Sequence, residues 1–292
     1  MKPLAKIICD NCGHANERNR GECDECQERI GHGYPNVNVY SDEYFTKGLQ
    51  ARYAAAEQHF QAGNITEHAS AFENAVEQEG RAVVNIDSRL FFTLANTNED
   101  YLPYRRAVEA NKRLYASIYN DTKRTMIDSC FYGMHGADIL FAALSLDDNG
   151  LCNYGSVSLV LKEQAIKKRT TIFERNSFVL YDVLTRERTW NPADFPPPTG
   201  YFGVWKDRAK MALAKCKEAL TSESDFLNLV LQNGESRAKD EFMELHIFGK
   251  ISIFTSQTVV FQEKITGAKL LIDLAITEEK LADRGIDLIQ HG

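Results

Sequence analysis

The sequence of 292 residues lacks several features that would place it in a specialised class of proteins. Its longest apolar stretch, residues 139–146, is too short to cross a bilayer, and the N-terminus lacks the apolar run and cleavage site of a secretion signal. The seven cysteines are odd in number and only four of them cluster, so they do not form a disulfide framework. We therefore expect a cytoplasmic protein without a membrane segment.

Familiar catalytic motifs are missing as well. The sequence has no glycine loop that would cradle phosphates, no Ser/His/Asp elbow and no metalloprotease helix pattern. Gly155 and Ser156 could open a nucleotidyltransferase motif, but residues 157–161 hold no carboxylates for a metal pair. Any activity must therefore depend on a less familiar arrangement.

The composition is that of a globular protein, with 43% hydrophobic and 26% charged residues. The formal charge of -7 is unevenly distributed, because residues 35–100 carry 4 basic and 10 acidic side chains whereas residues 101–215 carry 17 and 12. Only this central part is basic. A phosphate-bearing ligand is therefore expected there, and it should be small or bound locally.

The most specific motif is a pair of cysteine knuckles, Cys9-Asp-Asn-Cys12 and Cys23-Asp-Glu-Cys26. Two thiolates three residues apart can grip one side of a metal ion, and two such knuckles complete a closed tetrahedral zinc site. The pattern resembles a zinc ribbon, which we place at residues 1–34. An iron site and a redox pair are the alternatives.

The charge of the ribbon bears on what it binds. Residues 1–34 hold five basic and six acidic side chains, and four thiolates on a divalent ion add about two further negative charges. Such a surface would repel a phosphate backbone. We therefore favour a metal-stapled mini-domain that docks on the body or on a partner over a nucleic-acid reader.

Residues 35–135 form the predicted helical segment. From Ser41, apolar side chains recur every three or four residues as far as Phe60, and a second helix is expected from Thr66 as N-cap to Gly80. Further helices should follow Pro103 and Asp121, the latter as N-cap. Four tyrosines of this segment are expected to pack rather than to stack on bases: Tyr101, Tyr104, Tyr115 and Tyr119.

Residues 136–292 predict an α+β domain with a mixed or mostly antiparallel sheet, because strands are not regularly interleaved with helices. Short runs rich in β-branched and aromatic residues mark the strands. Three prolines make 195–200 an extended loop. The expected strands are 144–146, 157–161, 169–181, 243–253 and 259–261, and the expected helices are 205–220 and 222–231.

One predicted strand carries two polar residues. Alternation places Met243, Leu245 and Ile247 on one face and Glu244 and His246 on the other. On spacing alone, the solvated face of an edge strand is the simpler interpretation. A functional site is the alternative.

Residues 154–162, 168–177 and 243–249 resemble the core of bacterial ADP-ribosyltransferase-like domains of the toxin or effector type. The resemblance covers about a third of the chain. It implies a transferase fold, NAD as co-substrate and Glu244 as the catalytic carboxylate, with His246 where such domains usually carry glutamine. The arginine or histidine that grips NAD in the family would be Arg89, Arg169 or His135.

The resemblance also suggests further roles in binding NAD. Lys162, Arg169 or Arg175 would bind the pyrophosphate, Tyr154 or Phe173 would stack on the nicotinamide, and Asn176 and Ser177 would order the second strand. The chain would then modify a macromolecular target, protein or nucleic acid. The competing hypotheses are a non-enzymatic zinc-ribbon adaptor and an unrecognised hydrolase or nuclease.

Overall fold

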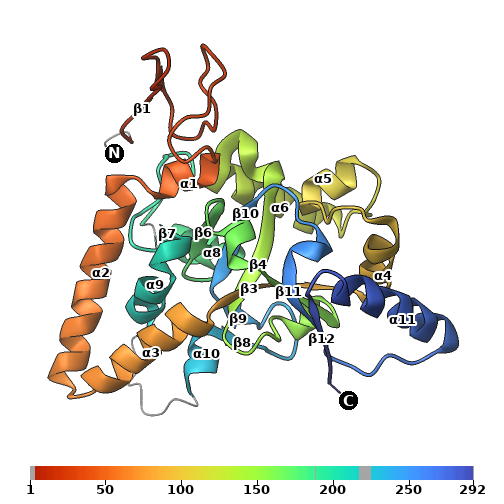
Figure 1. Cartoon of the computed structure of the whole chain (residues 1–292). Coiled ribbons are helices and arrows are strands. Elements are labelled where there is room, and N and C mark those ends of the chain that lie inside the picture. The colour runs from red at the N-terminus through yellow and green to blue at the C-terminus, as the bar shows by residue number, and fades with distance from the viewer. Residues whose placement is uncertain (1–3, 188, 217–224, 292) are drawn as a thin grey trace.

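The computed structural model describes residues 4–187, 189–216 and 225–291 and shows an α+β protein built around one large sheet (Figure 1). In these residues the sheet has eight strands, ordered β12-β11-β5-β3-β4-β10-β6-β7. It is mixed, because β11 and β12 are parallel and the other pairs are antiparallel. In that order the strands span Asp287–Gln290, Ser256–Phe261, Val157–Leu161, Arg81–Ile86, Ile139–Ser145, Glu244–Phe248, Thr170–Phe173 and Phe202–Val204.

Strand β3 corrects the prediction that residues 35–135 are helical. Its sequence, Arg-Ala-Val-Val-Asn-Ile, contains three β-branched residues, and the strand pairs with both β4 and β5. Four of its six side chains are buried. The expected helical segment therefore contributes an interior strand, and the sheet takes strands from both sides of residue 136.

One face of the sheet is covered by helices that share a large aliphatic core. Leu49 and Phe60 of α2, Phe72 of α3 and Met211 of α9 pack in this core with Leu245 of β10. Figure 1 shows α2, α3 and α9 at the left of the view and α4 and α11 at the right, and residues of all five helices belong to this one core. The helices represented in this core span Glu43–Ala62 (α2), Thr66–Glu79 (α3), Ser88–Thr97 (α4), Arg208–Lys215 (α9), Phe226–Val230 (α10) and Ala268–Ala282 (α11).

The opposite face is covered over β4, β10 and β6 by α1 (Pro35–Tyr40), α6 (Ile118–Tyr132) and α8 (Ser177–Arg186). Its core is aromatic. The rings of Tyr40 and Phe202 stack with centroids 5.1 Å apart, and Phe131 packs edge-on to Phe173 at 5.1 Å. Aromatic pairs at such distances add to the stabilisation that burial provides. This face also carries Glu244 and His246.

The smaller elements complete the molecule. The ribbon has a two-stranded sheet, and a second small sheet lies beside α10. The remaining elements are β1 (Ile7–Ile8), β2 (Ala15–Asn16), α5 (Tyr104–Glu109), α7 (Glu163–Ile166), β8 (Leu231–Gln232), β9 (Glu241–Phe242) and the 3-10 helices η1 (Gly133–Asp138), η2 (Cys152–Tyr154), η3 (Trp205–Asp207) and η5 (Ile253–Thr255).

The first predicted helices are confirmed with small shifts at their ends. Asp42 caps α2 by accepting from the Tyr44 amide, and α2 ends at Ala62 with Gly63 as its C-cap. The N-cap of α3 is Ile65, so Thr66 is the first helical residue. The N-cap of α6 is Ser117, and Asp121 accepts from the Ser117 amide within the first turn. The prediction that Asp121 is itself the cap is therefore wrong. The exposed fractions of Tyr115 and Tyr119 are 72% and 74%, so the prediction that they are packing residues is also wrong.

The expected strand 169–181 ends early. Strand β6 covers Thr170–Phe173, and α8 begins at Ser177 after Asn176, whose side chain accepts from the Phe178 amide. The apolar residues on both sides of this N-cap asparagine hide the boundary between strand and helix. The helix predicted at 205–220 is confirmed as far as Lys215, as η3 and α9, and α10 confirms part of the helix predicted at 222–231. Residues 217–224 lie outside the described part.

Candidate active site and metal centre

The four cysteines of the ribbon converge as the sequence predicts. Their sulfurs all lie within 4.8 Å of one another, with Cys9 and Cys26 3.6 Å apart and Cys12 and Cys23 3.5 Å apart. Four thiolates at about 2.3 Å from a tetrahedral zinc ion stand about 3.8 Å from each other. The cluster therefore has the donor set and spacing to hold a metal ion such as zinc.

The ribbon is docked on the body through Asn38 of α1. The side-chain nitrogen of Asn38, Nδ2, donates to the carbonyls of Arg20 (2.6 Å) and Ile30 (3.1 Å), and its side-chain oxygen, Oδ1, accepts from the His32 backbone amide at 2.6 Å. The Asn38 side chain is fully buried. One asparagine thus satisfies three backbone groups of the ribbon, as a buried polar side chain must in order to be stable.

The same helix contacts the large sheet. Asn36 Nδ2 donates to the carbonyls of His246 (3.0 Å) and Arg169 (3.1 Å), and the Tyr40 hydroxyl donates to the Phe131 carbonyl of α6 at 3.0 Å. All six residues of α1 are buried. Helix α1 therefore lies between the ribbon that carries the four cysteines and the strand that carries Glu244 and His246.

Glu244 and His246 lie on an interior strand. Strand β10 pairs with β4 on one side and β6 on the other, and the exposed fractions of Glu244 and His246 are 2% and 0%. The predicted alternation is confirmed, since Met243, Leu245 and Ile247 belong to the aliphatic core of the other face. The alternative of a solvated edge strand is wrong. An ionisable pair at such a depth requires specific partners.

A chain of hydrogen bonds supplies these partners. Glu244 Oε2 accepts from the Ser177 amide (2.7 Å) and from His246 Nε2 (2.8 Å), while His246 Nδ1 bonds to the Tyr132 hydroxyl. Tyr132 also contacts Thr171 Oγ1 at 3.2 Å. A carboxylate only accepts, so His246 donates from Nε2 and its Nδ1 accepts from Tyr132, which is the pattern of a neutral imidazole.

The protonation states follow from burial and from these partners. Burial alone would raise the pKa of Glu244. The contact with His246, the positive charge of Arg124 and the hydrogen bond from the Ser177 amide together lower it by more, so the pKa lies below its ordinary value. Burial lowers the pKa of His246 against the attraction of Glu244. The pair is therefore a carboxylate beside a neutral histidine at neutral pH.

Helix α6 brings three further polar residues to this site. Arg124 Nη1 donates to Ser177 Oγ at 3.3 Å and lies 3.7 Å from Asp128 Oδ1, and Tyr132 follows four residues later. The Arg124 guanidinium lies over the rings of Phe141 and Phe178, 4.3 Å from each centroid. Sequence reasoning missed these residues. Their i, i+4, i+8 spacing, which places polar groups on one helix face, was the available signal.

Asp128 differs from Glu244 in its environment. Burial and the nearby charge of Glu244 raise the pKa of Asp128 to about 7, although Arg124 and Arg105 oppose the shift. The site therefore contains two carboxyl groups whose pKa values are displaced in opposite directions. Such pairs are characteristic of sites where one group stays ionised and the other exchanges a proton.

The structure brings some of the predicted NAD-binding residues to Glu244. Ser177 bonds to it, and Tyr154 lies near enough for the charge of Glu244 to add to burial in raising the Tyr154 pKa to about 12. Phe173 packs against His246 with centroids 4.0 Å apart, but its ring is fully buried. Asn176 caps α8, so Asn176 and Ser177 begin a helix and do not order a strand.

Other predicted residues lie elsewhere. Arg169 precedes β6 at the Phe248 end of β10, about 13 Å along the strand from Glu244 at 3.3 Å per residue. Its guanidinium donates to the carbonyls of Ala165, Phe248 and Lys250. The other predicted residues are distributed as follows: Lys162 follows β5, Arg89 is exposed on α4, His135 lies on η1 near Phe248, and Arg175 pairs with Glu174.

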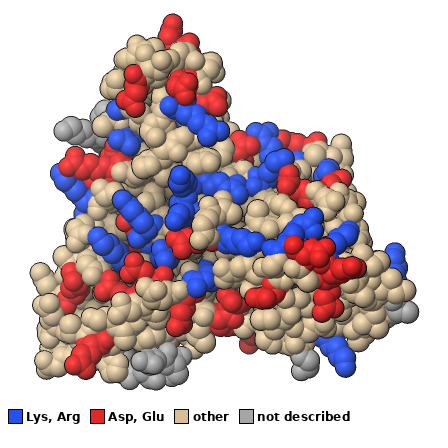
Figure 2. Space-filling model, viewed as in Figure 1, with Lys and Arg blue, Asp and Glu red and all other residues tan. Residues whose placement is uncertain are grey.

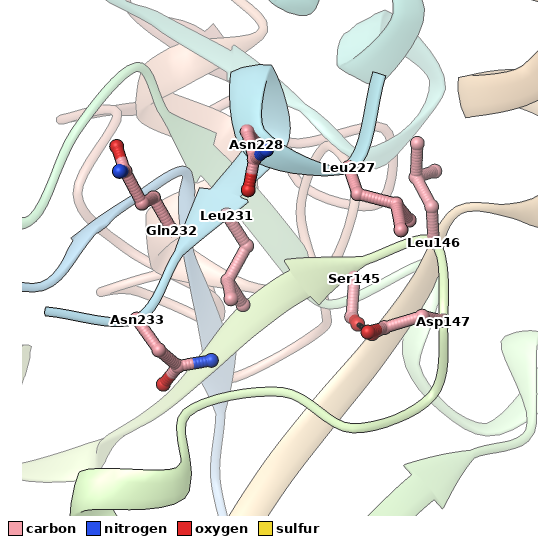
Figure 3. Close-up of a pocket in the computed structure, with 8 residues that line it drawn as sticks. All are labelled: Ser145, Leu146, Asp147, Leu227, Asn228, Leu231, Gln232 and Asn233. Atoms are coloured by element: carbon pink, nitrogen blue, oxygen red, sulfur yellow. Dashed lines mark hydrogen bonds between the residues drawn. The ribbon is translucent and has the colours of Figure 1, made fainter. Parts of the chain in front are cut away.

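A cavity of about 300 Å³ opens on the face of the sheet that carries Glu244 (Figure 3). On β4, Ala143 pairs with Glu244, and Ser145 lines the cavity two residues further on. Ser145 Oγ donates to Asp147 Oδ1 at 2.7 Å. Figure 3 shows the amide side chains of Asn228 and Asn233 around this space, which lies in the size range of small-molecule sites.

Comparison with protein families and with curated proteins finds no match for this chain. Among the helices of the described residues, none combines the length and the apolar character required to cross a bilayer.

Proposed function

We propose that the chain is an NAD-dependent ADP-ribosyltransferase that modifies a macromolecular target, with Glu244 as the catalytic carboxylate. One observation carries the proposal: an ionised carboxylate is buried on an interior strand with only one oxygen engaged. Among the described residues, Ser177 and His246 both donate to Oε2, and none donates to Oε1. The resemblance of residues 243–249 to such enzymes supports the same assignment.

The chemistry requires a carboxylate of this kind. When the bond between ribose C1 and the nicotinamide nitrogen breaks, the nitrogen keeps the electron pair and positive charge develops on the ribose. Glu244 Oε1 would accept from the ribose 2′-hydroxyl and face this charge. The carboxylate then stabilises the transition state more than bound NAD, and its effect is large because the site excludes water.

His246 and Tyr132 serve this proposal as positioning residues. Both nitrogens of the imidazole are engaged, one by Glu244 and one by Tyr132, so the ring cannot turn without losing a buried hydrogen bond. His246 is fully buried. It therefore acts through Glu244 and does not contact the substrate.

Arg124 and Asp128 complete the proposed machinery. The Arg124 cation, placed between two aromatic rings, would bind the pyrophosphate, and the cavity at Ser145 would receive the adenosine half. A pKa of about 7 allows Asp128 to accept the proton that the target nucleophile loses as it bonds to ribose C1. The products are nicotinamide and the ADP-ribosylated target.

For the ribbon we propose a structural zinc ion held by Cys9, Cys12, Cys23 and Cys26. Four thiolates leave no open position for catalysis, which is typical of structural sites. Asn16 Nδ2 lies 3.6 Å from Cys23 Sγ and Asn11 Nδ2 lies 3.5 Å from Cys26 Sγ, so side-chain amides support two of the sulfurs. The metal would hold the backbone that docks on Asn38.

The test is release of nicotinamide from NAD by the purified chain and by Glu244→Gln. The variant keeps the size of the side chain and removes its charge, and we expect activity to fall by about 10²- to 10³-fold. Glu241→Gln is the matched control, because Glu241 is exposed three residues upstream. Full activity of Glu244→Gln would refute the assignment, and a wild-type chain that neither binds nor consumes NAD would favour the adaptor alternative.

A further inference from the structure

A second cavity lies between α3 and α9, in the layer of helices that covers the aliphatic face of the sheet. Its volume of about 430 Å³ is in the range of small-molecule sites. Phe72 of α3 and Met211 of α9 pack with Leu245 of β10, whereas Glu244 points to the opposite, aromatic face. The sheet therefore separates this cavity from the site proposed for NAD, and a ligand bound here would not contact Glu244.

The two walls of the cavity carry opposite charges. The acidic wall is formed by Glu73 and Glu77, which lie one turn apart on α3. The basic wall is formed by Lys206, Arg208 and Lys210 of η3 and the first turn of α9. Figure 2 shows Lys and Arg side chains at the left of the face viewed, over the region where Figure 1 labels α9, and Asp and Glu side chains below them toward α3.

The charges of the two walls are not neutralised within the described part of the chain. None of the five side chains forms an ion pair with a described residue. Glu73 accepts from the Tyr53 hydroxyl at 3.2 Å and Lys210 donates to Gln50 Oε1 at 3.1 Å, so these hydrogen-bond partners are uncharged. Charges of both signs around one cavity are therefore available to a ligand that carries both.

Arg208 is the buried member of the basic wall. It is only 7% exposed, and its guanidinium lies over the Trp205 ring, 4.6 Å from the centroid. Nη2 donates to the Glu77 carbonyl at 2.7 Å, Nη1 donates to the Trp205 carbonyl at the long distance of 3.4 Å, and the buried Nε has no acceptor. A guanidinium has five N–H groups, so most of its capacity to donate is unused. A carboxylate in the cavity would use it.

Burial leaves a charge on each wall incompletely stabilised. Burial raises the pKa of Glu73, and the charge of Glu77 adds to the shift although Lys210 opposes it. Burial lowers the pKa of Arg208, although nearby glutamates oppose this shift. A positive charge at the acidic wall and a negative charge at the basic wall would therefore both stabilise the folded protein.

We propose that this cavity binds a free α-amino acid, with its ammonium group at Glu73 and Glu77 and its carboxylate at Arg208 and the two lysines. A purely anionic ligand would leave the acidic wall unpaired and add negative charge beside it. A purely cationic ligand would do the same to the basic wall. The volume of the cavity limits the ligand to a small molecule. An α-amino acid carries both charges on neighbouring atoms and satisfies both walls.

Binding is tested by isothermal titration calorimetry of the full chain, without NAD, against each common L-amino acid. We expect at least one to bind with a Kd below about 1 mM. Two analogues of that amino acid test the charges. The 2-hydroxy acid replaces the ammonium group, the α-carboxamide replaces the carboxylate, and each should bind at least about tenfold more weakly. No binding of any amino acid, or undiminished binding of either analogue, would overturn the proposal.

The acidic wall is tested by the double variant Glu73→Gln with Glu77→Gln, which keeps the size of both side chains. Its affinity for the amino acid should fall at least about tenfold. Its preference for the amino acid over the 2-hydroxy acid should disappear, which a general loss of structure would not produce. Glu278→Gln with Glu279→Gln, at exposed positions of α11, is the matched control and should bind as the wild type does. An unchanged preference in the first variant would place the ammonium group elsewhere and refute the assignment.

The basic wall is tested by Lys206→Gln with Lys210→Gln, because both lysines are exposed and the buried Arg208 stays in place. This variant should lose most of the preference for the amino acid over the α-carboxamide and keep the preference over the 2-hydroxy acid. Lys264→Gln with Lys269→Gln removes the same charge from exposed positions elsewhere and should change neither preference. Equal behaviour of the two lysine variants would contradict the proposed position of the carboxylate.

Discussion

Replacing Asp128 with asparagine tests the electrostatic account of the site. Asp128 is 2% exposed, and burial together with Glu244 raises its pKa from 3.8 to about 7. The folded state therefore binds the proton more tightly than the unfolded chain does. A shift of about three pKa units corresponds to about 4 kcal/mol. This stabilisation of the folded state by the proton on Asp128 is fully present below the pKa that Asp128 has in the unfolded chain. It is lost as the pH rises through the pKa of Asp128 in the folded state.

Asparagine is nearly the same size and cannot ionise, so Asp128→Asn resembles the protonated side chain at every pH. We expect the variant and the wild type to have similar unfolding free energies near pH 4. Between pH 4 and pH 7 the wild type should lose about 1.4 kcal/mol per pH unit relative to the variant, and above pH 7 the difference should level off at about 4 kcal/mol.

The assay is urea unfolding of both proteins at several pH values, since groups common to both cancel in the difference. Asp287→Asn controls for the loss of a carboxylate at an exposed position. A difference between the wild type and Asp128→Asn that does not change between pH 5 and pH 8 would show that Asp128 is solvated or strongly paired. Its proposed role as proton acceptor would then be refuted.

Two predictions concern the ribbon. Purified protein should contain about one zinc per chain. The double variant Cys9→Ser with Cys12→Ser should bind no zinc, and its residues 1–34 should become sensitive to protease. An unchanged metal content in this variant would contradict the four-thiolate site. Asn38→Ala should reduce the unfolding free energy by about 3 kcal/mol, because Arg20, Ile30 and His32 each lose a buried hydrogen bond. Urea unfolding measures this loss. A loss below about 0.5 kcal/mol would mean that these backbone groups find other hydrogen-bond partners.

The features that sequence reasoning found are local ones. Each knuckle of the ribbon places two cysteines within four residues, so the geometry of each pair is fixed by a short turn. The two faces of β10 follow from a period of two, and Met243 and Leu245 do pack opposite Glu244. Both patterns survive in the structure because neither depends on which other segments lie nearby.

The missed features depend on distant segments. Nothing near Glu244 in the sequence indicates that β4 and β6 flank its strand, since their paired residues Ala143 and Phe173 lie 101 and 71 positions away. Strand β3 is hidden in the sequence because Arg81–Ile86 follows an amphipathic helix directly after Gly80. The residues of α6 that face Glu244 look like part of a scaffold helix for the same reason, because the strand that they face is remote in the sequence.

Helix α1 links the proposed zinc site to a site that contains none of its four cysteines. Asn38 holds the ribbon, and Asn36, two residues earlier, holds the backbone of His246 and Arg169. A six-residue helix is too short to be stable alone, so its conformation depends on both of these contacts. Loss of the metal would free the ribbon backbone that Asn38 binds, and α1 would lose half of its hydrogen-bonded support. The strand that positions Glu244 would then be exposed to water on the side of His246, where the neutral imidazole depends on burial.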